Sequence, residues 1–183
     1  MRRFLLILGI VAVVLAVIVY AMVTRTKSYS QEGTVSFSNG DLKVGVFYNR
    51  PHKKGRVIFA KDGLVPFGKV WRTGANEATV FETNRDLNFD GKTLPKGRYS
   101  LWTIPDEMSW GVIFNSDVPL WGMGFDGQTL RKPENDVLTI KAPVVLQEKE
   151  FEQFTISIEK TGEEMELVFI WDKTLVAAPF SAK

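Results

Sequence analysis

The stretch that decides the fold is TVSFSNGDLKVGVFY, residues 34–48. Apolar residues occupy alternate positions on both sides of the dipeptide Asn39-Gly40. They are Val35 and Phe37 before it, and Leu42, Val44, Val46 and Tyr48 after it. A period of two places apolar side chains on one face of a strand, and Asn-Gly between two such runs indicates a hairpin because both turn positions need a positive φ. The stretch therefore predicts an antiparallel hairpin with one buried face.

The same pattern continues to the end of the chain. Leu87 and Phe89 lead into Asp90-Gly91, a second hairpin signal, and Leu94 follows it. Further alternating runs lie at residues 99–103, 110–114, 137–141, 154–158 and 165–171. No stretch after residue 24 has a helical face. Residues 34–183 are therefore expected to form one all-β domain, an antiparallel β-sandwich in the style of a jelly roll or an immunoglobulin domain.

The first 23 residues differ in kind from the rest. Phe4 to Val23 is a run of 20 residues without a charged or strongly polar side chain. A helix rises about 1.5 Å per residue, so this run spans about 30 Å, the thickness of the bilayer hydrocarbon. Residues 1–23 are therefore expected to form a transmembrane signal-anchor helix that contacts the lipid bilayer through Phe4 to Val23. The polar residues 24–33 are expected to form a short tether.

A cleaved signal peptide is the alternative to an anchor. Val19-Tyr20-Ala21 offers small residues at the spacing that cleavage needs, but the apolar run continues past this site to Val23. Arg2 and Arg3 precede the helix, which favours a cytoplasmic N-terminus. We therefore expect a single-pass protein of the inner (cytoplasmic) membrane, with the C-terminal domain in the periplasm or outside the cell.

The charges and the absence of cysteine exclude several classes of function. All 21 acidic residues follow residue 23, whereas two of the 23 basic residues precede it, so residues 24–183 carry no net charge. Nucleic-acid binding needs a positive surface field, which a neutral domain lacks. Disulfides and thiolate chemistry are excluded because the chain has no cysteine.

Residues 50–79 break the alternation and are rich in glycine, proline, basic and aromatic residues, which is typical of an irregular segment that carries function. Within this segment, residues 71–77 (WRTGANE) suit a polar ligand. Trp71 would stack on it, and Arg72 would bind a carboxylate or phosphate. The candidate ligand-binding residues are Arg50, Trp71, Arg72, Thr73, Asn76, Glu77 and Trp121.

The same residues also fit a purely structural role. Arg72 would then pair with Glu77, and Asn76 would bond to backbone groups in an irregular loop. Gly74 would supply a φ that other residues avoid. The sequence alone is compatible with both interpretations.

Three further motifs do not meet the requirements of the sites that they resemble. Asp86-x-Asn88-x-Asp90-Gly91 begins like a calcium loop, but Gly97 stands where a bidentate glutamate is needed. Residues 122–127 (GMGFDG) match the dinucleotide fingerprint without the strand and helix that it needs. His52 is the single histidine and lies in a basic turn, so it does not define a triad or a metal site. No catalytic residue, metal or cofactor is therefore expected.

Four stretches together resemble one bacterial envelope family. They are Tyr48-Asn49-Arg50-Pro51, Val65 to Thr79 (VPFGKVWRTGANEAT), Leu94 to Leu101 (LPKGRYSL) and Trp110 to Asn115 (WGVIFN). In this pattern, which covers roughly Val35 to Phe180, the chain resembles the domain of unknown function 2911 family. The resemblance implies a predominantly β domain, often exported or membrane-anchored, and no established reaction.

The sequence favours a membrane-anchored envelope β-sandwich that is a non-catalytic binding or assembly module. Its expected partner is an envelope glycan or a protein, and not a nucleic acid. The alternative is a small envelope hydrolase that uses Glu77, with Arg72 as electrostatic support. A structure can distinguish the two, because carboxylate-only hydrolysis needs two carboxylates that converge in one cleft.

Overall fold

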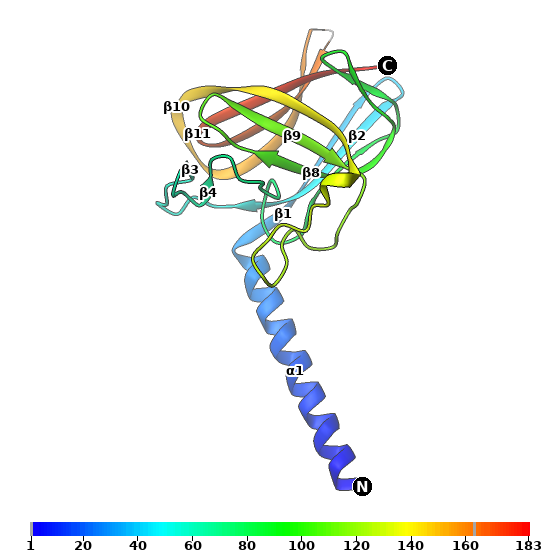
Figure 1. Ribbon diagram of the computed structural model, residues 1–183, viewed down its shortest axis with the longest axis vertical. Coiled ribbons are helices and arrows are strands. Elements are labelled where there is room, and N and C mark those ends of the chain that lie inside the picture. Colours follow the sequence, from blue (N-terminus) through cyan, green and yellow to red (C-terminus); the bar gives the residue numbers. More distant parts are fainter. Residues whose placement is uncertain (1, 163) are drawn as a thin grey trace.

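The chain folds into one long helix followed by a β-domain (Figure 1). This computed structural model describes residues 2–162 and 164–183. The helix, α1, runs from Arg2 to Ser28 and projects away from the β-domain.

The β-domain is built from one large antiparallel sheet and one small parallel ribbon. In chain order its strands are β1 (Ser30–Asn39), β2 (Leu42–Pro51), β3 (Phe59–Ala60), β4 (Val65–Pro66), β5 (Thr79–Thr83), β6 (Leu87–Phe89), β7 (Lys92–Leu94), β8 (Gly97–Ile104), β9 (Ser109–Asn115), β10 (Asp136–Thr161) and β11 (Glu164–Ala182), with a short 3-10 helix, η1 (Pro133–Asn135), before β10. The large sheet has the order β1-β2-β5-β8-β9-β10-β11-β6-β7, and β3 pairs with β4 alone. The β3–β4 ribbon lies within the irregular segment that the sequence predicts over residues 50–79.

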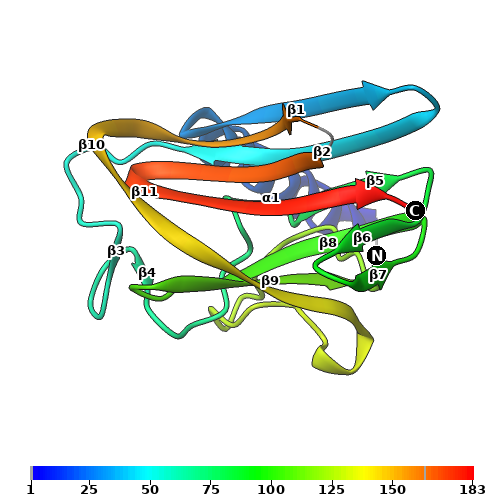
Figure 2. The ribbon, with the colours of Figure 1, turned by 90° about the horizontal axis from the view of Figure 1, so that it is seen from above.

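The long strand β10 folds the large sheet into two layers. Its residues 136–143 pair with β9, and its residues 144–161 pair with β11. Register shifts between Leu146, Phe151 and Thr155 mark the bend, as expected for β-bulges. Figure 2 shows β10 running diagonally from β9 and then turning back beside β1 and β2. The predicted antiparallel β-sandwich behind one helix is thereby confirmed.

Both predicted hairpins are confirmed, with one change in the first turn. Asp90 and Gly91 connect β6 to β7 and have φ values of 48° and 79°, as this two-residue turn requires. Between β1 and β2 the turn residues are Gly40 and Asp41, because Asn39 is still paired with β2. Only Gly40 has a positive φ in that turn, at 62°.

The side chain of Tyr48 explains this register. Tyr48 lies opposite Gly33, and a Cβ on Gly33 would lie 3.0 Å from the tyrosine ring and 2.8 Å from Cδ of Arg50. A turn at Asn39-Gly40 would instead place Gln31 opposite Tyr48, where its side chain would meet the same ring. The position of the turn therefore depends on the contact between Gly33 and Tyr48, which lie opposite each other and are 15 residues apart in the chain.

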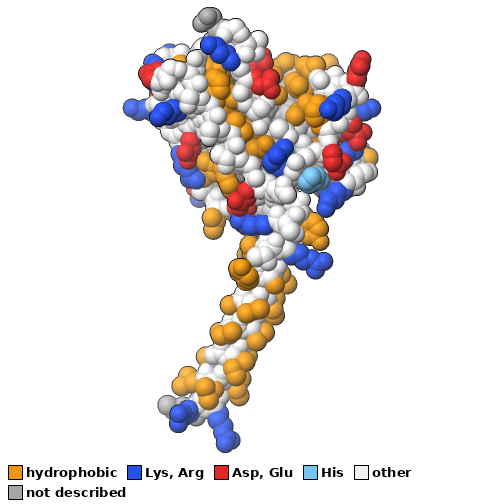
Figure 3. All heavy atoms as spheres, turned by 180° about the vertical axis from the view of Figure 1, so that it is seen from behind, with side chains coloured by type: hydrophobic (Ala, Val, Ile, Leu, Met, Phe, Trp, Pro, Cys, Tyr) orange, Lys and Arg blue, Asp and Glu red, His pale blue; other side chains and the backbone are white. Residues whose placement is uncertain are grey.

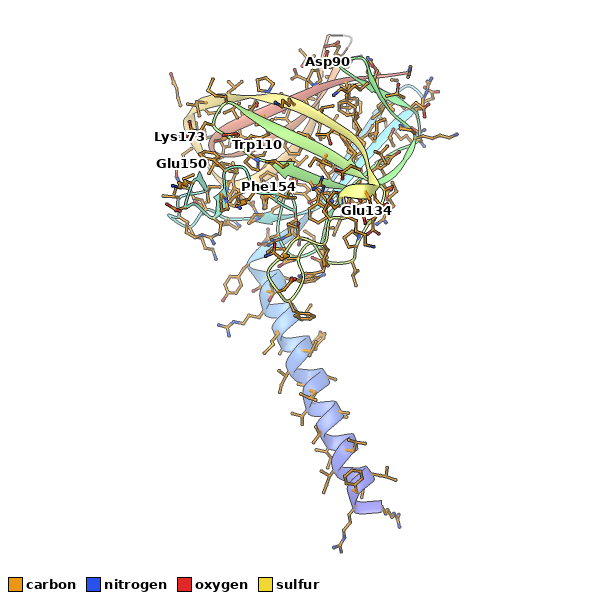
Figure 4. The ribbon with its side chains drawn as sticks, viewed as in Figure 1. Asp90, Trp110, Glu134, Glu150, Phe154 and Lys173 are labelled. Atoms are coloured by element: carbon orange, nitrogen blue, oxygen red, sulfur yellow. The ribbon has the colours of Figure 1, made fainter. Side chains whose placement is uncertain are left out.

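The interior between the two layers is rich in aromatic side chains, among them Trp110 and Phe154 (Figure 4). The ring of Trp71 lies 4.8 Å from that of Phe154 and 6.1 Å from that of Trp110, measured between centroids. Trp110 and Trp171 are buried, as the alternation of their strands predicts, and Trp102 is fully buried as well. Large aromatic rings therefore hold the two layers together.

Residues 24–33, where the sequence predicts a tether, lie at the junction of α1 and β1. Helix α1 continues to Ser28 and β1 begins at Ser30, so a single residue connects the two elements. The hydroxyls of Thr24 and Thr26 donate to backbone carbonyls one turn earlier, which lets these polar residues remain helical. The helix end is therefore joined directly to the sheet.

Helix α1 is long and apolar enough to cross a membrane. None of its residues is buried, and Figure 3 shows apolar side chains along most of its length, with basic side chains at its free end and most other charged side chains on the β-domain. A helix that is apolar all round and lacks a protein partner is typical of a segment surrounded by lipid. An N-terminal helix of this kind is a membrane anchor or a signal sequence.

Candidate functional site

The WRTGANE segment forms a loop with unusual backbone angles. Thr73 and Asn76 have φ values of 54° and 58°, a region that residues other than glycine seldom occupy. Gly74 passes so close to β2 that a Cβ would lie 2.9 Å from the backbone oxygen of Asn49, so this position requires glycine. Backbone angles of this kind persist only where neighbouring groups hold them, and they are frequent at binding sites.

Hydrogen bonds from two neighbouring strands hold this loop. The hydroxyl of Thr79 donates to the carbonyl of Thr73 over 2.8 Å, and the hydroxyl of Thr73 donates to that of Thr103 over 3.1 Å. The backbone of Trp71 pairs with Thr103 through two hydrogen bonds of 2.7 and 3.0 Å. Thr73 is fully buried, so it supports the loop and is not placed to touch a ligand.

Trp71 does not offer the exposed stacking face that the sequence predicts. Only 7% of its surface is exposed. Its ring stacks on that of Trp171 at 5.9 Å, and its Nε1 donates to the carbonyl of Gly74 over 3.1 Å. Trp71 is therefore part of the aromatic core because its large apolar surface is buried between the layers.

Arg72 carries a positive charge inward without an acidic partner. Its Nη1 contacts Sδ of Met123, and its Nε is buried with no hydrogen-bond partner among residues 2–162 and 164–183. Desolvation by burial lowers the pKa of the guanidinium, which still remains charged at neutral pH. The predicted pair with Glu77 is wrong, since no ion pair joins Arg72 to a carboxylate in the described part of the chain.

A second loop, residues 117–132 between β9 and η1, closes over Arg72. A Cβ on Gly122 would lie 2.4 Å from Cδ of Arg72, so glycine lets this loop lie directly on the arginine side chain. The backbone N–H of Gly122 donates to the carbonyl of Asn76 over 3.0 Å. Nδ2 of Asn76 is buried and, within the described ranges, has no acceptor. The site thus contains two buried donors, on Arg72 and Asn76, that lack acceptors.

Arg72 and Asn76 line a pocket of about 680 Å³ that we call the Arg72 pocket. Thr26 and Tyr29, at the end of α1 and just after it, form part of its wall, and Met123 contributes from the second loop. The pocket therefore lies at the junction of the helix and the β-domain.

The wall of the Arg72 pocket is positively charged. Besides Arg72 it includes the cations Lys54 and Arg56, together with His52, and no aspartate or glutamate is among the described residues that line it. A concave surface lined by one sign of charge concentrates ligands of the opposite sign.

The contacts of these basic groups leave their charges largely uncompensated. Nζ of Lys54 lies 4.8 Å from the ring of Tyr29, and the guanidinium of Arg56 donates to backbone carbonyls, one of them that of His52. Outside the wall, a carboxylate oxygen of Glu152 accepts a hydrogen bond of 2.8 Å from the backbone N–H of Lys54 and lies 4.0 Å from Nδ1 of His52.

Glu77 faces the helix and not the pocket. Its Oε1 lies 2.7 Å from Nζ of Lys27, and its Oε2 accepts a hydrogen bond of 2.9 Å from Asn49. Lys27 also donates to Glu32 over 2.8 Å, and these bonds, first to Glu32 and then to Glu77, raise the pKa of Lys27. Glu77 therefore ties the end of α1 to the β-domain.

Glu77→Gln is expected to loosen the end of α1, because glutamine keeps the size of the side chain and removes the charge that holds Lys27. Tryptic cleavage after Lys27 in the full chain in detergent should become faster than in the wild type. The matched control is Glu82→Gln, which breaks an exposed ion pair of 2.7 Å with Arg98. A cleavage rate that is the same in all three proteins would contradict this role of Glu77.

Two other predicted residues lie outside the Arg72 pocket. Nη2 of Arg50 donates to the hydroxyl of Thr155 over 3.0 Å, so Arg50 links β2 to β10. Trp121 is half-buried beside Gly122 in the second loop. Of the predicted candidates, the structure brings together Trp71, Arg72 and Asn76 in the pocket.

Sequence reasoning missed the other basic residues of the pocket. The sequence places His52 in a basic turn without a site, whereas the structure pairs it with Gln153 in an isolated bridge and places it in the pocket wall. The basic residues His52, Lys54 and Arg56 lie close together in the irregular segment, and this clustering could have indicated a basic site. Nothing in the sequence indicates that Met123 lies beside Arg72, because the two residues are 51 positions apart in the chain.

The sequence motifs that resemble other sites form turns. Asp86 accepts a hydrogen bond of 2.8 Å from the backbone N–H of Lys96, which fixes the β7–β8 connection. In residues 122–127, the N–H of Gly127 donates to the carbonyl of Gly124 over 3.1 Å. No cluster of three or more His, Asp or Glu residues suited to a metal ion occurs in the searched, described part of the chain.

The fold and the site define a class of protein: a β-sandwich behind an apolar N-terminal helix, with a positively charged pocket at their junction. A family model described as "Protein of unknown function (DUF2911)" matches residues 30–180, so the chain belongs to this family, as its motifs predict. No curated protein and no solved structure matches the chain. Because the family description assigns no activity, the function has to be argued from the pocket.

Proposed function

We propose that this protein is a membrane-anchored, non-catalytic binding module of the cell envelope whose Arg72 pocket binds an acidic group, a carboxylate or a phosphate, on its ligand. The proposal depends on the guanidinium of Arg72, whose Nε is buried without an acceptor and which has no carboxylate partner in the described residues. A buried charge without a partner is costly, so a protein that keeps one normally uses it.

The groups around Arg72 suit an anion. Arginine presents a planar set of donors that matches both oxygens of a carboxylate or phosphate. Nδ2 of Asn76 supplies a second donor, and the remaining basic residues of the wall are His52, Lys54 and Arg56. A pocket of about 680 Å³ is within the range for small ligands, so an acidic sugar or a short acidic peptide end would fit.

The residues that line the Arg72 pocket favour a binding function over hydrolysis. A carboxylate-only hydrolase needs two carboxylates in one cleft, and the described residues that line the Arg72 pocket include none. Glu77, the carboxylate on which the hydrolase alternative depends, is engaged by Lys27 and Asn49. The structure therefore favours the binding module.

The proposal places the pocket at a membrane surface. α1 has the length and composition of a membrane-spanning helix, and only one residue separates it from β1. The β-domain would lie on the side opposite to Arg2 and Arg3, as the excess of positive charge on cytoplasmic segments favours. An anchored domain with its pocket beside the helix would meet ligands at the envelope face of the inner membrane.

Calorimetric titration of the full chain in detergent micelles tests the binding function with two matched probe pairs. The pairs are glucuronate against glucose, and glycerol 3-phosphate against glycerol. The acidic member of at least one pair is expected to bind, more weakly as salt is added, while its neutral counterpart gives no binding heat. Absence of binding by both acids, or equal binding of an acid and its neutral counterpart, would refute the proposal.

A further inference from the structure

Loop 117–132 exposes large apolar side chains at its tip. Leu120 is 87% exposed and Phe125 is fully exposed, and Leu130 in the same loop is 40% exposed. Apolar side chains gathered on one loop are typical of a surface that contacts lipid or another protein. The loop also contains Trp121, which is half-buried.

This loop lies on the same side of the β-domain as the helix. In Figure 1 its yellow-green trace hangs below the sheet, beside the upper end of α1. Met123 of the loop and Thr26 of α1 line the same pocket, which places the two segments next to each other. The loop is therefore level with the last turns of the helix.

The helix fixes the depth of the loop relative to a bilayer. The apolar run ends at Val23 and α1 ends at Ser28, five residues later. At about 1.5 Å per residue, this distance is about 7.5 Å, close to the thickness of about 5 to 7 Å of one headgroup layer. A loop beside the last turns of α1 thus lies in the headgroup layer, one side chain away from the acyl region.

The side chains of the loop suit that position. Tryptophan and tyrosine favour the membrane interface, and Trp121 and the half-exposed Tyr29 lie at this level. The acidic group nearest the tip, Asp126, accepts a hydrogen bond of 3.0 Å from the backbone N–H of Gln128. Lys132 is paired with Asp117 at 2.9 Å and Arg131 is paired with Asp136, so the basic residues of the loop are compensated within the β-domain.

We propose that loop 117–132 is a second membrane contact, which inserts Leu120 and Phe125 into the leaflet on the side of the β-domain. The inference rests on the proposed anchor, because α1 sets the position of the bilayer. Two contacts, the helix and the loop, fix the tilt of the β-domain. They also hold the mouth of the Arg72 pocket at the membrane surface, since Met123 belongs to both the loop and the pocket wall.

The full chain in lipid nanodiscs provides the test, with one chain per disc. The discs contain phosphatidylcholine, either unlabelled or brominated at shallow acyl positions, and bromine quenches only indoles that come close to it. Trp71, Trp102, Trp110 and Trp171 are buried, so Trp121 is the tryptophan placed to be quenched. Brominated lipid is expected to quench the fluorescence, and Trp121→Phe is expected to remove most of that quenching.

A double variant tests the apolar side chains. Leu120→Asp with Phe125→Asp changes only exposed positions, so the core stays intact, and it should lower the quenched fraction by about half or more, because charged side chains are excluded from the acyl region. Met108→Asp is the matched control: Met108 is 81% exposed and precedes β9, at the opposite end of that strand from the loop. It should leave the quenching unchanged.

The possible results test the membrane anchor and the loop contact as two distinct proposals. If the chain does not co-elute with nanodiscs, both the membrane anchor and the loop contact are refuted. A chain that co-elutes but whose Trp121 is not quenched overturns the loop contact alone. Quenching that appears only with two chains per disc would assign the loop to a contact between copies and would also overturn the proposal.

Discussion

Replacement of Trp71 by alanine is expected to lower the free energy of unfolding by about 3 to 5 kcal/mol, the range for large aromatic residues removed from a core. The indole packs against Trp171 and Phe154 at centroid distances of 5.9 and 4.8 Å. Its Nε1 also satisfies the carbonyl of Gly74, which would lose its partner. Urea denaturation of the full chain in detergent, followed by the circular dichroism of the β-domain, measures the change.

Trp121→Ala is the control for this experiment. Trp121 is half-buried in loop 117–132, outside the aromatic core, so its removal should change the free energy of unfolding by about 1 kcal/mol or less. If Trp71 were a stacking face for ligand, its replacement would weaken binding and leave stability nearly unchanged. That result would restore the exposed role that the sequence suggested and would contradict the core position.

The elements of the fold could be predicted from sequence because their signals are local. A period of two identifies the buried face of a strand, and dipeptides such as Asp90-Gly91 specify a turn. The arrangement of the two layers could not be predicted in this way. It depends on β10, which changes partner from β9 to β11 between Pro143 and Val144 and bends between Leu146 and Thr155. No short-range pattern records which partner a long strand will take.

The sequence draws attention to residues 71–77, but it does not show where their side chains lie. The residues 71–77 do contain the arginine and amide of the pocket, yet Trp71 is directed inward and Glu77 toward Lys27. Periodicity assigns faces only in regular structure, and the positive φ values of Thr73 and Asn76 reverse the chain in this loop. The partners that decide each role lie far away in sequence.

Replacement of Arg72 by methionine is expected to raise the free energy of unfolding by about 1 to 2 kcal/mol, as observed where buried charged groups give way to apolar ones of similar size. Methionine fills the space of the arginine stem and removes the buried Nε–H of Arg72, which lacks an acceptor. The same change should abolish binding of the acidic probe, because the charged fork that would hold its oxygens is gone. Arg72→Met would thus raise the free energy of unfolding and remove the affinity for the acidic probe.

Two further variants make this test of Arg72 decisive. Arg72→Lys keeps the charge and loses the planar fork, so it should weaken binding less than Arg72→Met and should not raise stability. Arg98→Met is the matched control, since Arg98 is more than half exposed and pairs with Glu82 on the surface. It should leave acid binding unchanged. A loss of several kcal/mol of stability in Arg72→Met would instead assign Arg72 a structural role, because a residue that serves only the fold destabilises the protein when its interactions are removed.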